Sequence, residues 1–246
     1  MYGLKRMLYF IGVLTLLTII MVFLDNAFHL GLTSDAGLDI FITPLVMICS
    51  LIIVYPMLRS DFNKWFLLDK KKLHQAICFP ILLSVLMTFL VNLYRFVPYW
   101  LGHEVIGVGS NQVTTVEGIT DIGLEIGSVV FGPFTEEFIF RYGLFAGVAL
   151  FISYSLRNNI LKYERYKKLF DQNKKTIIIT WLILTNILFA LAHGPNVLNF
   201  PLYFITGVID TLLFLRFGFL AAWISHGTFN LFSGISLQII MNVLVY

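Results

Sequence analysis

The chain has 246 residues, of which 58% are apolar and 13% are charged, and its formal net charge is +3. Soluble domains carry roughly 25% charged residues, and the mean hydropathy of this chain is +0.85. A soluble domain, a disordered chain and a nucleic-acid-binding protein are therefore excluded. We expect an all-α, polytopic transmembrane helix bundle that forms a single membrane domain over residues 1–246, with the lipid bilayer as its partner and no nucleic acid.

Long apolar runs mark the expected spans in chain order: 7–24, 40–58, 75–94, 119–156, 176–193, 200–216 and 219–246. The run at 119–156 would be about 57 Å long as one helix, nearly twice the hydrocarbon thickness of roughly 30 Å. Gly132-Pro133 predicts a break there, with a new helix starting at Pro133. The last run contains a possible hinge at Ser233-Gly234, so the bundle is expected to have seven or eight helices.

Basic residues indicate how the chain is oriented. Of the 17 Lys and Arg, 14 lie before the first run, between the second and third runs, or between 157 and 175. The loops at 25–39 and 96–118 contain acidic residues and no Lys or Arg. The positive-inside rule then predicts a multi-pass protein of the cell membrane with a cytoplasmic N-terminus.

The fourth run contains two adjacent acids, Glu136 and Glu137, followed by Arg141. Glu137 and Arg141 are four residues apart with the acid first, which is the favoured order for a helical ion pair. Pairing them leaves Glu136 without a partner, in the first turn of a helix that starts at Pro133, where the helix dipole favours a carboxylate. An ionised, unpaired carboxylate at membrane depth is a candidate for a water-activating base.

Two later runs contain histidines at similar spacing. Phe189 and His193 share one helix face, and so do His226 and Asn230. Two hydrogen-bonding groups aimed at one point can hold an oxyanion or ligate a metal. Taken singly, each group also fits a structural role, as an interfacial histidine or as an interhelical hydrogen bond.

The three patterns occur in order on successive apolar runs, Glu-Glu-x-x-x-Arg, then Phe-x-x-x-His, then His-x-x-x-Asn, over roughly residues 130–231. In this order they resemble the CAAX-protease and bacteriocin-processing family of intramembrane proteases, also called the Abi family. A small residue and a proline often precede the acid pair in that family, and Gly132-Pro133 does so here.

The resemblance implies about eight helices around a polar intramembrane cavity, with a protease core at about 119–246. It implies hydrolysis of a peptide bond in a membrane-associated peptide or protein, with Glu136 activating water and His193 assisting it. His226 and Asn230 would stabilise the oxyanion, while Glu137 and Arg141 would shape the site. The family processes prenylated C-terminal motifs, bacteriocin leaders and peptide pheromones in peptide maturation, and nothing in this sequence selects among them.

Three alternatives stay open. Glu136 with the two histidines could form a zinc site, although we expect no cofactor, because Glu136 would have to act as both ligand and base. The chain could be a non-catalytic membrane scaffold or immunity protein. It could also be a cation-coupled transporter, because acidic residues recur at Glu117, Asp121, Glu125 and Asp210.

The depths of the candidate residues disagree. Counted from the basic loops, Glu136 lies about 30 Å and His193 about 27 Å along their helices, but His226 lies only about 12 Å from Gly218. The three side chains converge only if the fourth and fifth helices extend into the cytoplasm before they meet the basic loop, or if the last helix begins below the membrane surface.

Overall fold

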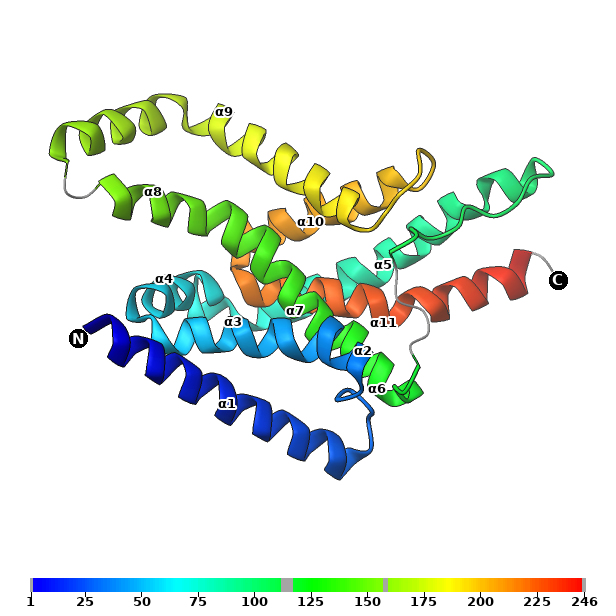
Figure 1. The fold of residues 1–246 in the computed structure, drawn as a ribbon. Helices are drawn as coiled ribbons and strands as arrows, with labels where there is room; N and C mark the ends of the chain where they lie inside the picture. Colours follow the sequence, from blue (N-terminus) through cyan, green and yellow to red (C-terminus); the bar gives the residue numbers. More distant parts are fainter. Residues whose placement is uncertain (1, 112–116, 157–158, 245–246) are drawn as a thin grey trace.

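The computed structural model of the protein describes residues 2–111, 117–156 and 159–244, and these ranges contain helices and no strand (Figure 1). The all-α prediction is confirmed. In chain order the elements are α1 (Tyr2–Phe28), α2 (Asp35–Gly37), η1 (Leu38–Ile42), α3 (Thr43–Val54), α4 (Pro56–Phe66), η2 (Lys70–Lys72), α5 (Leu73–Trp100), α6 (Asp121–Ile126), η3 (Gly127–Phe131), α7 (Gly132–Glu137), η4 (Phe138–Gly147), α8 (Val148–Leu156), α9 (Ile160–Ala192), α10 (Phe200–Phe217) and α11 (Phe219–Leu244).

Six helical stretches in the described ranges are long and apolar enough to cross a membrane: Leu4–Phe28, Asp35–Val54, Lys70–Trp100, Asp121–Leu156, Phe170–Ala192 and Phe200–Phe217. The protein is therefore a polytopic membrane protein. Helix α11 has 26 residues and packs along α5, and its sequence includes the polar residues His226 and Asn230, but it is not one of these six. With α11 included, the described chain has seven long helical stretches, the lower of the two expected numbers.

The expected break at Gly132-Pro133 is wrong. Residues Asp121–Leu156 form one continuous helical rod, in which α7 lies between the π-helical stretches η3 and η4. The Gly132 N–H bonds to the Gly127 carbonyl, five residues back, and Pro133 takes a first-turn position of α7. This wide turn shifts the hydrogen-bond register where the proline has no N–H to offer. Glu136 and Glu137 therefore lie inside a long rod, so the expected dipole at a helix start does not act on them.

Two other boundaries differ from the expectation. The helix within the run at 40–58 ends at Val54, and Pro56 begins the separate helix α4, so this run is not one span. Helix α11 continues through Ser233-Gly234, so the expected hinge there is also wrong.

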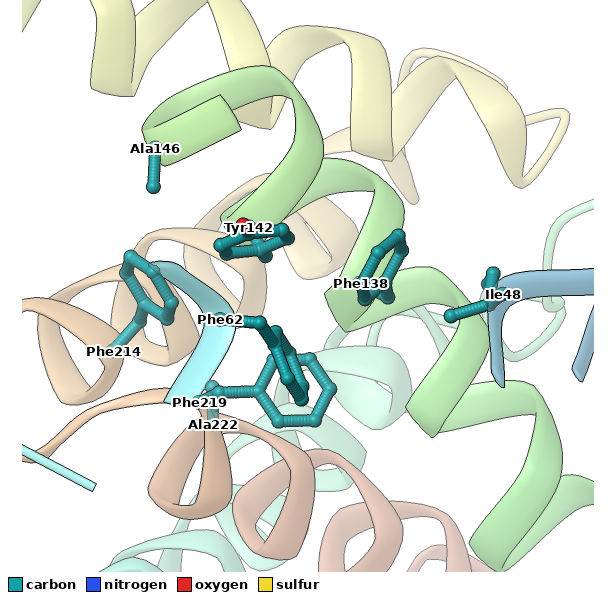
Figure 2. Packing of buried hydrophobic residues seen from close by; sticks show 8 residues of the cluster. All are labelled: Ile48, Phe62, Phe138, Tyr142, Ala146, Phe214, Phe219 and Ala222. Atoms are coloured by element: carbon teal, nitrogen blue, oxygen red, sulfur yellow. The ribbon is translucent and has the colours of Figure 1, made fainter. Parts of the chain in front are cut away.

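An aromatic cluster joins α4, the rod, α10 and α11 (Figure 2). The Phe62 ring lies 5.5 Å from Phe138 and 5.0 Å from each of Tyr142 and Phe219, measured between centroids. The Tyr142 hydroxyl also donates a hydrogen bond to Asp61 on α4 at 3.0 Å. Because Tyr142 follows Arg141 directly, these contacts hold the rod in place beside the candidate ion pair.

Polar pairs set the register between α5 and α11, which lie side by side in Figure 1. Ser84 and Ser225 are 2.8 Å apart at their hydroxyls, and the Asn92 amide donates to the Ser236 hydroxyl at 2.7 Å. Hydrogen bonds of this kind hold helices together in lipid, where the hydrophobic effect gives no preference between helix and lipid contacts. The α5 pairs thus fix the rotation of α11 that points His226 and Asn230 towards the rod.

Candidate active site

The structure brings three side chains from different elements together: Glu136 of α7, His193 at the end of α9 and His226 of α11. The Glu136 Oε2 atom lies 3.6 Å from His193 Nε2 and 3.9 Å from His226 Nε2. The Glu136 side chain is 36% exposed, whereas those of His193 and His226 are 14% and 8% exposed. The carboxylate therefore meets both rings and still faces an open space.

The hydrogen-bond partners of the two imidazoles fix where their protons lie. His193 Nδ1 is 2.8 Å from the Phe189 carbonyl, and His226 Nδ1 is 2.9 Å from Glu137 Oε1. A carbonyl and an ionised carboxylate only accept, so Nδ1 of each ring carries the hydrogen. Both rings consequently turn Nε2 towards Glu136.

This arrangement places two acceptors opposite each other. A neutral His193 has a lone pair at Nε2, and Glu136 Oε2 accepts no direct hydrogen bond in the described structure. Two such acceptors need a donor between them, and a water molecule has two O–H groups to offer. Chemically, the pair is suited to holding a water by both of its protons.

A second ionic group lies behind Glu136 and is fully buried. Glu137 Oε2 is 3.1 Å from Arg141 Nε, so the ion pair expected from the four-residue spacing is present. Arg141 Nη2 lies 3.9 Å from Asp210 and donates to the Gly207 carbonyl at 3.1 Å. The guanidinium also lies 4.1 Å from the centre of the Phe189 ring, a cation–π distance. Glu137 and Arg141 thus tie the rod to α9, α10 and α11.

Asn230 lies beside the same space and donates one amide N–H to the Ser128 carbonyl at 2.8 Å. An open cavity of about 380 Å³ runs along these groups. Its wall includes Glu136, His193, His226 and Asn230, the four expected catalytic residues. The other residues that line it are Ile40, Phe41, Asn111, Ser128, Gly132, Thr135, Phe229, Ser233 and Gly234.

Sequence reasoning missed the support around His193. The Tyr203 ring stacks on the imidazole with a centroid distance of 4.6 Å, and its hydroxyl accepts a hydrogen bond from Gly109 N at 2.6 Å. A Cβ at Gly109 would lie 2.1 Å from the His193 carbonyl oxygen, so only glycine allows this approach. Asn111 donates to the Ala192 carbonyl at 3.0 Å. These contacts join residues that are far apart in the chain, and no spacing pattern in the sequence indicates them.

The acidic residues considered for transport do not form one route. Glu117, Asp121 and Glu125 are exposed, whereas Asp210 is buried beside Arg141. The sequence marked Asp210 as an ionisable residue in an apolar run, but its place beside the ion pair was not anticipated.

One group of possible metal ligands occurs in the part of the chain that the structure describes. Atoms of Glu137, Asp210 and His226 lie within 4.8 Å of one another. Arg141 lies 3.1 Å from Glu137 and 3.9 Å from Asp210, so a fixed cation already balances these carboxylates. The donor set therefore fits a buried ionic network better than a site for a second cation.

Comparison with known proteins identifies the segment that contains the site. The family model described as "Type II CAAX prenyl endopeptidase Rce1-like" matches residues 120–232. No curated protein and no solved structure matches the chain. The match confirms the resemblance to the CAAX-protease and Abi family, and it includes the rod, α9, α10 and the first half of α11. Residues 120–232 of this membrane protein, which hold the candidate site, are therefore similar to the Rce1-like family of type II CAAX prenyl endopeptidases.

Proposed function

We propose that this protein is an intramembrane endopeptidase that hydrolyses a peptide bond of a membrane-associated peptide or protein with a glutamate-activated water. The observation that carries the proposal is the facing pair of acceptors, Glu136 Oε2 and His193 Nε2, 3.6 Å apart at the wall of the cavity. The family match supports the class of reaction.

The chemistry follows from the placement of these groups. Glu136 takes a proton from the water while the water oxygen attacks the carbonyl carbon, and His193 orients the second O–H. The peptide carbonyl becomes a tetrahedral oxyanion. The protonated Glu136 then gives its proton to the leaving nitrogen, and the C–N bond breaks. The carboxylate is restored by this second transfer, so the step balances without a cofactor.

His226 and Asn230 are placed to stabilise the oxyanion. In its charged form, His226 donates from Nδ1 to Glu137 and from Nε2 towards the cavity. The Asn230 amide has two N–H groups, one of which donates to Ser128. Removal of one such donor typically costs roughly 10²- to 10³-fold in rate.

We propose that the protein lies in the cell membrane with its N-terminus in the cytoplasm, because Lys5, Arg6 and the later basic segments share one expected side. The substrate is a peptide or protein that reaches the cavity from the membrane.

The test of the base is Glu136→Gln, which keeps the shape of the side chain and removes its ability to accept a proton. We expect cleavage of a model peptide in vesicles to be lost while expression and thermal stability stay near wild type. A fully active Gln variant would rule out Glu136 as the base.

The same assay tests the zinc alternative. We expect a membrane-permeant chelator to leave cleavage intact, because a carboxylate base needs no Lewis acid. A zinc-bound water depends on the ion for its reactivity. Loss of activity on chelation, restored by stoichiometric zinc, would replace the metal-free mechanism with a metalloprotease.

A further inference from the structure

A second cavity lies away from the candidate active site and shares no lining residue with it. It has a volume of about 610 Å³ and lies between the rod, α4, α9 and α10. Its wall is mostly apolar: Trp65, Phe145, Ala146, Val148, Ala149, Leu150, Ile152, Tyr166, Phe170, Ile177, Ile178, Trp181 and Leu215, with Asp61, Ser153 and Lys174 as the other members.

The apolar wall of the cavity accommodates part of an acyl chain. Along α9 its lining runs from Tyr166 to Trp181 on both sides of a kink at Asn173, and the stretch from Lys174 to Trp181 is about 10 Å of helix at about 1.5 Å per residue. One leaflet of hydrocarbon is about 15 Å thick, half of the roughly 30 Å core. The part of a lipid tail nearest its headgroup therefore fits along this stretch, where Ile177, Ile178 and Trp181 offer it an apolar wall.

The charge around the cavity selects the headgroup. Helix α9 carries two acids, Glu164 and Asp171, in its first half, against six bases over the same stretch: Lys162, Arg165, Lys167, Lys168, Lys174 and Lys175. Lys174 itself lines the cavity. Basic pockets between membrane helices favour anionic headgroups, and the Asp61 carboxylate on the other wall already accepts the Tyr142 hydroxyl.

We propose that the groove between α8 and α9 is a binding site for an anionic phospholipid, with one acyl chain along Ile177, Ile178 and Trp181 and the phosphate at Lys174. The occupant is a membrane lipid, because the groove joins an apolar wall to the basic stretch of α9. Asp61 connects the site to the rod through Tyr142, the residue after Arg141.

Two tryptophans on the wall, Trp65 and Trp181, give a direct readout. The purified full-length protein in detergent is titrated with phosphatidylglycerol that carries bromine on its acyl chains, and tryptophan quenching is followed. We expect quenching by brominated phosphatidylglycerol to saturate. Brominated phosphatidylcholine should need an at least fivefold higher concentration to reach half of its maximal quenching. Trp181→Phe should remove much of the saturable part. Equal half-saturation by the two lipids would overturn the anionic site, and quenching without saturation would overturn the site altogether.

Matched variants separate the site from general lipid adsorption. Lys174→Gln should weaken phosphatidylglycerol binding several-fold, whereas Lys175→Gln, one residue along the helix and off the groove, should not change it. Ala149→Phe fills the groove and should reduce the quenching amplitude for both lipids. If Lys175→Gln weakens binding as much as Lys174→Gln, the contribution is diffuse surface charge and the proposal is wrong. The Lys pair decides the result even if the Phe variant fails to fold.

Discussion

Glu137 performs a structural task at the residue scale that its neighbour Glu136 does not share. It contacts Arg141 at 3.1 Å and His226 at 2.9 Å, and its side chain has no exposed surface. Glu136 has the same charge but is 36% exposed at the cavity. Successive helix positions are rotated by about 100°. This rotation places Glu137 in a buried ionic link and leaves Glu136 as an accessible carboxylate.

Glu137→Gln should destabilise the protein by about 3 kcal/mol, at the lower end of the range for breaking a buried pair. The loss is limited because Asp210 remains 3.9 Å from Arg141. Adding Asp210→Asn removes that second partner and should lower stability further. The measurement is the thermal unfolding midpoint in detergent.

Glu125→Gln is the control, since Glu125 lies on the same rod and is exposed. Its free energy of unfolding should stay within about 0.5 kcal/mol of wild type, so its unfolding midpoint should stay near the wild-type midpoint. If Glu137→Gln unfolds at the same temperature as this control, the Glu137–Arg141 pair does not contribute to stability.

The contact between α9, α10 and the rod depends at the element scale on a glycine. A Cβ at Gly207 would lie 2.6 Å from Asn186 Oδ1, 2.8 Å from the Phe189 ring and 3.3 Å from Arg141 Nη2. These atoms belong to groups held by buried hydrogen bonds and by the cation–π contact, so they have little freedom to move away.

Gly207→Ala should therefore destabilise the protein by about 1 to 3 kcal/mol through overpacking. Gly234→Ala is the matched comparison, because a Cβ there meets nothing within 4 Å and α11 is continuous through that position. It should leave stability unchanged or raise it by up to about 1 kcal/mol, since alanine favours a helix interior over glycine. A loss of stability in Gly234→Ala would indicate that α11 needs a hinge there after all.

Patterns within one helix were predictable from the sequence, and contacts between helices were not. The Glu137–Arg141 spacing predicted its ion pair because four residues bring side chains onto one face. The continuity of the rod through Pro133 was missed, since π-helical turns depend on the surroundings and leave no clear signature in composition. The partners of Glu136 were inferred from the family resemblance, and their convergence at 3.6 Å and 3.9 Å became visible only in three dimensions.

The depths of the site residues show how the whole molecule brings them together. Helix α9 has 33 residues and the rod spans 36, both far more than the roughly 20 needed to cross a bilayer. The candidate span within α9 starts only at Phe170, so the polar turns before it extend the helix beyond the apolar part. Counted from Phe170, however, His193 is about 35 Å along its helix, so this extension does not remove the depth mismatch with His226. Helix α11 begins at Phe219, which is buried against Phe62 and Phe66 of α4, so its start lies inside the bundle and closer to the depth of the site.

The orientation of the whole molecule predicts a labelling pattern. With Cys49 and Cys78 replaced by alanine, Glu104→Cys should react with a membrane-impermeant maleimide in intact cells, because its loop has no basic residue. Lys71→Cys should react only after the cells are permeabilised. Labelling of Lys71→Cys in intact cells would reverse the proposed topology.

The pairing of α11 with α5 and the rod has a consequence for biosynthesis. The rod, which carries Glu136, precedes α9 with His193, and α11 with His226 and Asn230 comes after both. A chain that leaves the ribosome therefore inserts its carboxylate well before the groups that would support the oxyanion. Until α11 docks through Ser225 and Ser236, the growing polypeptide lacks half of the proposed machinery. On the proposed mechanism, a nascent chain without α11 therefore cannot stabilise the oxyanion.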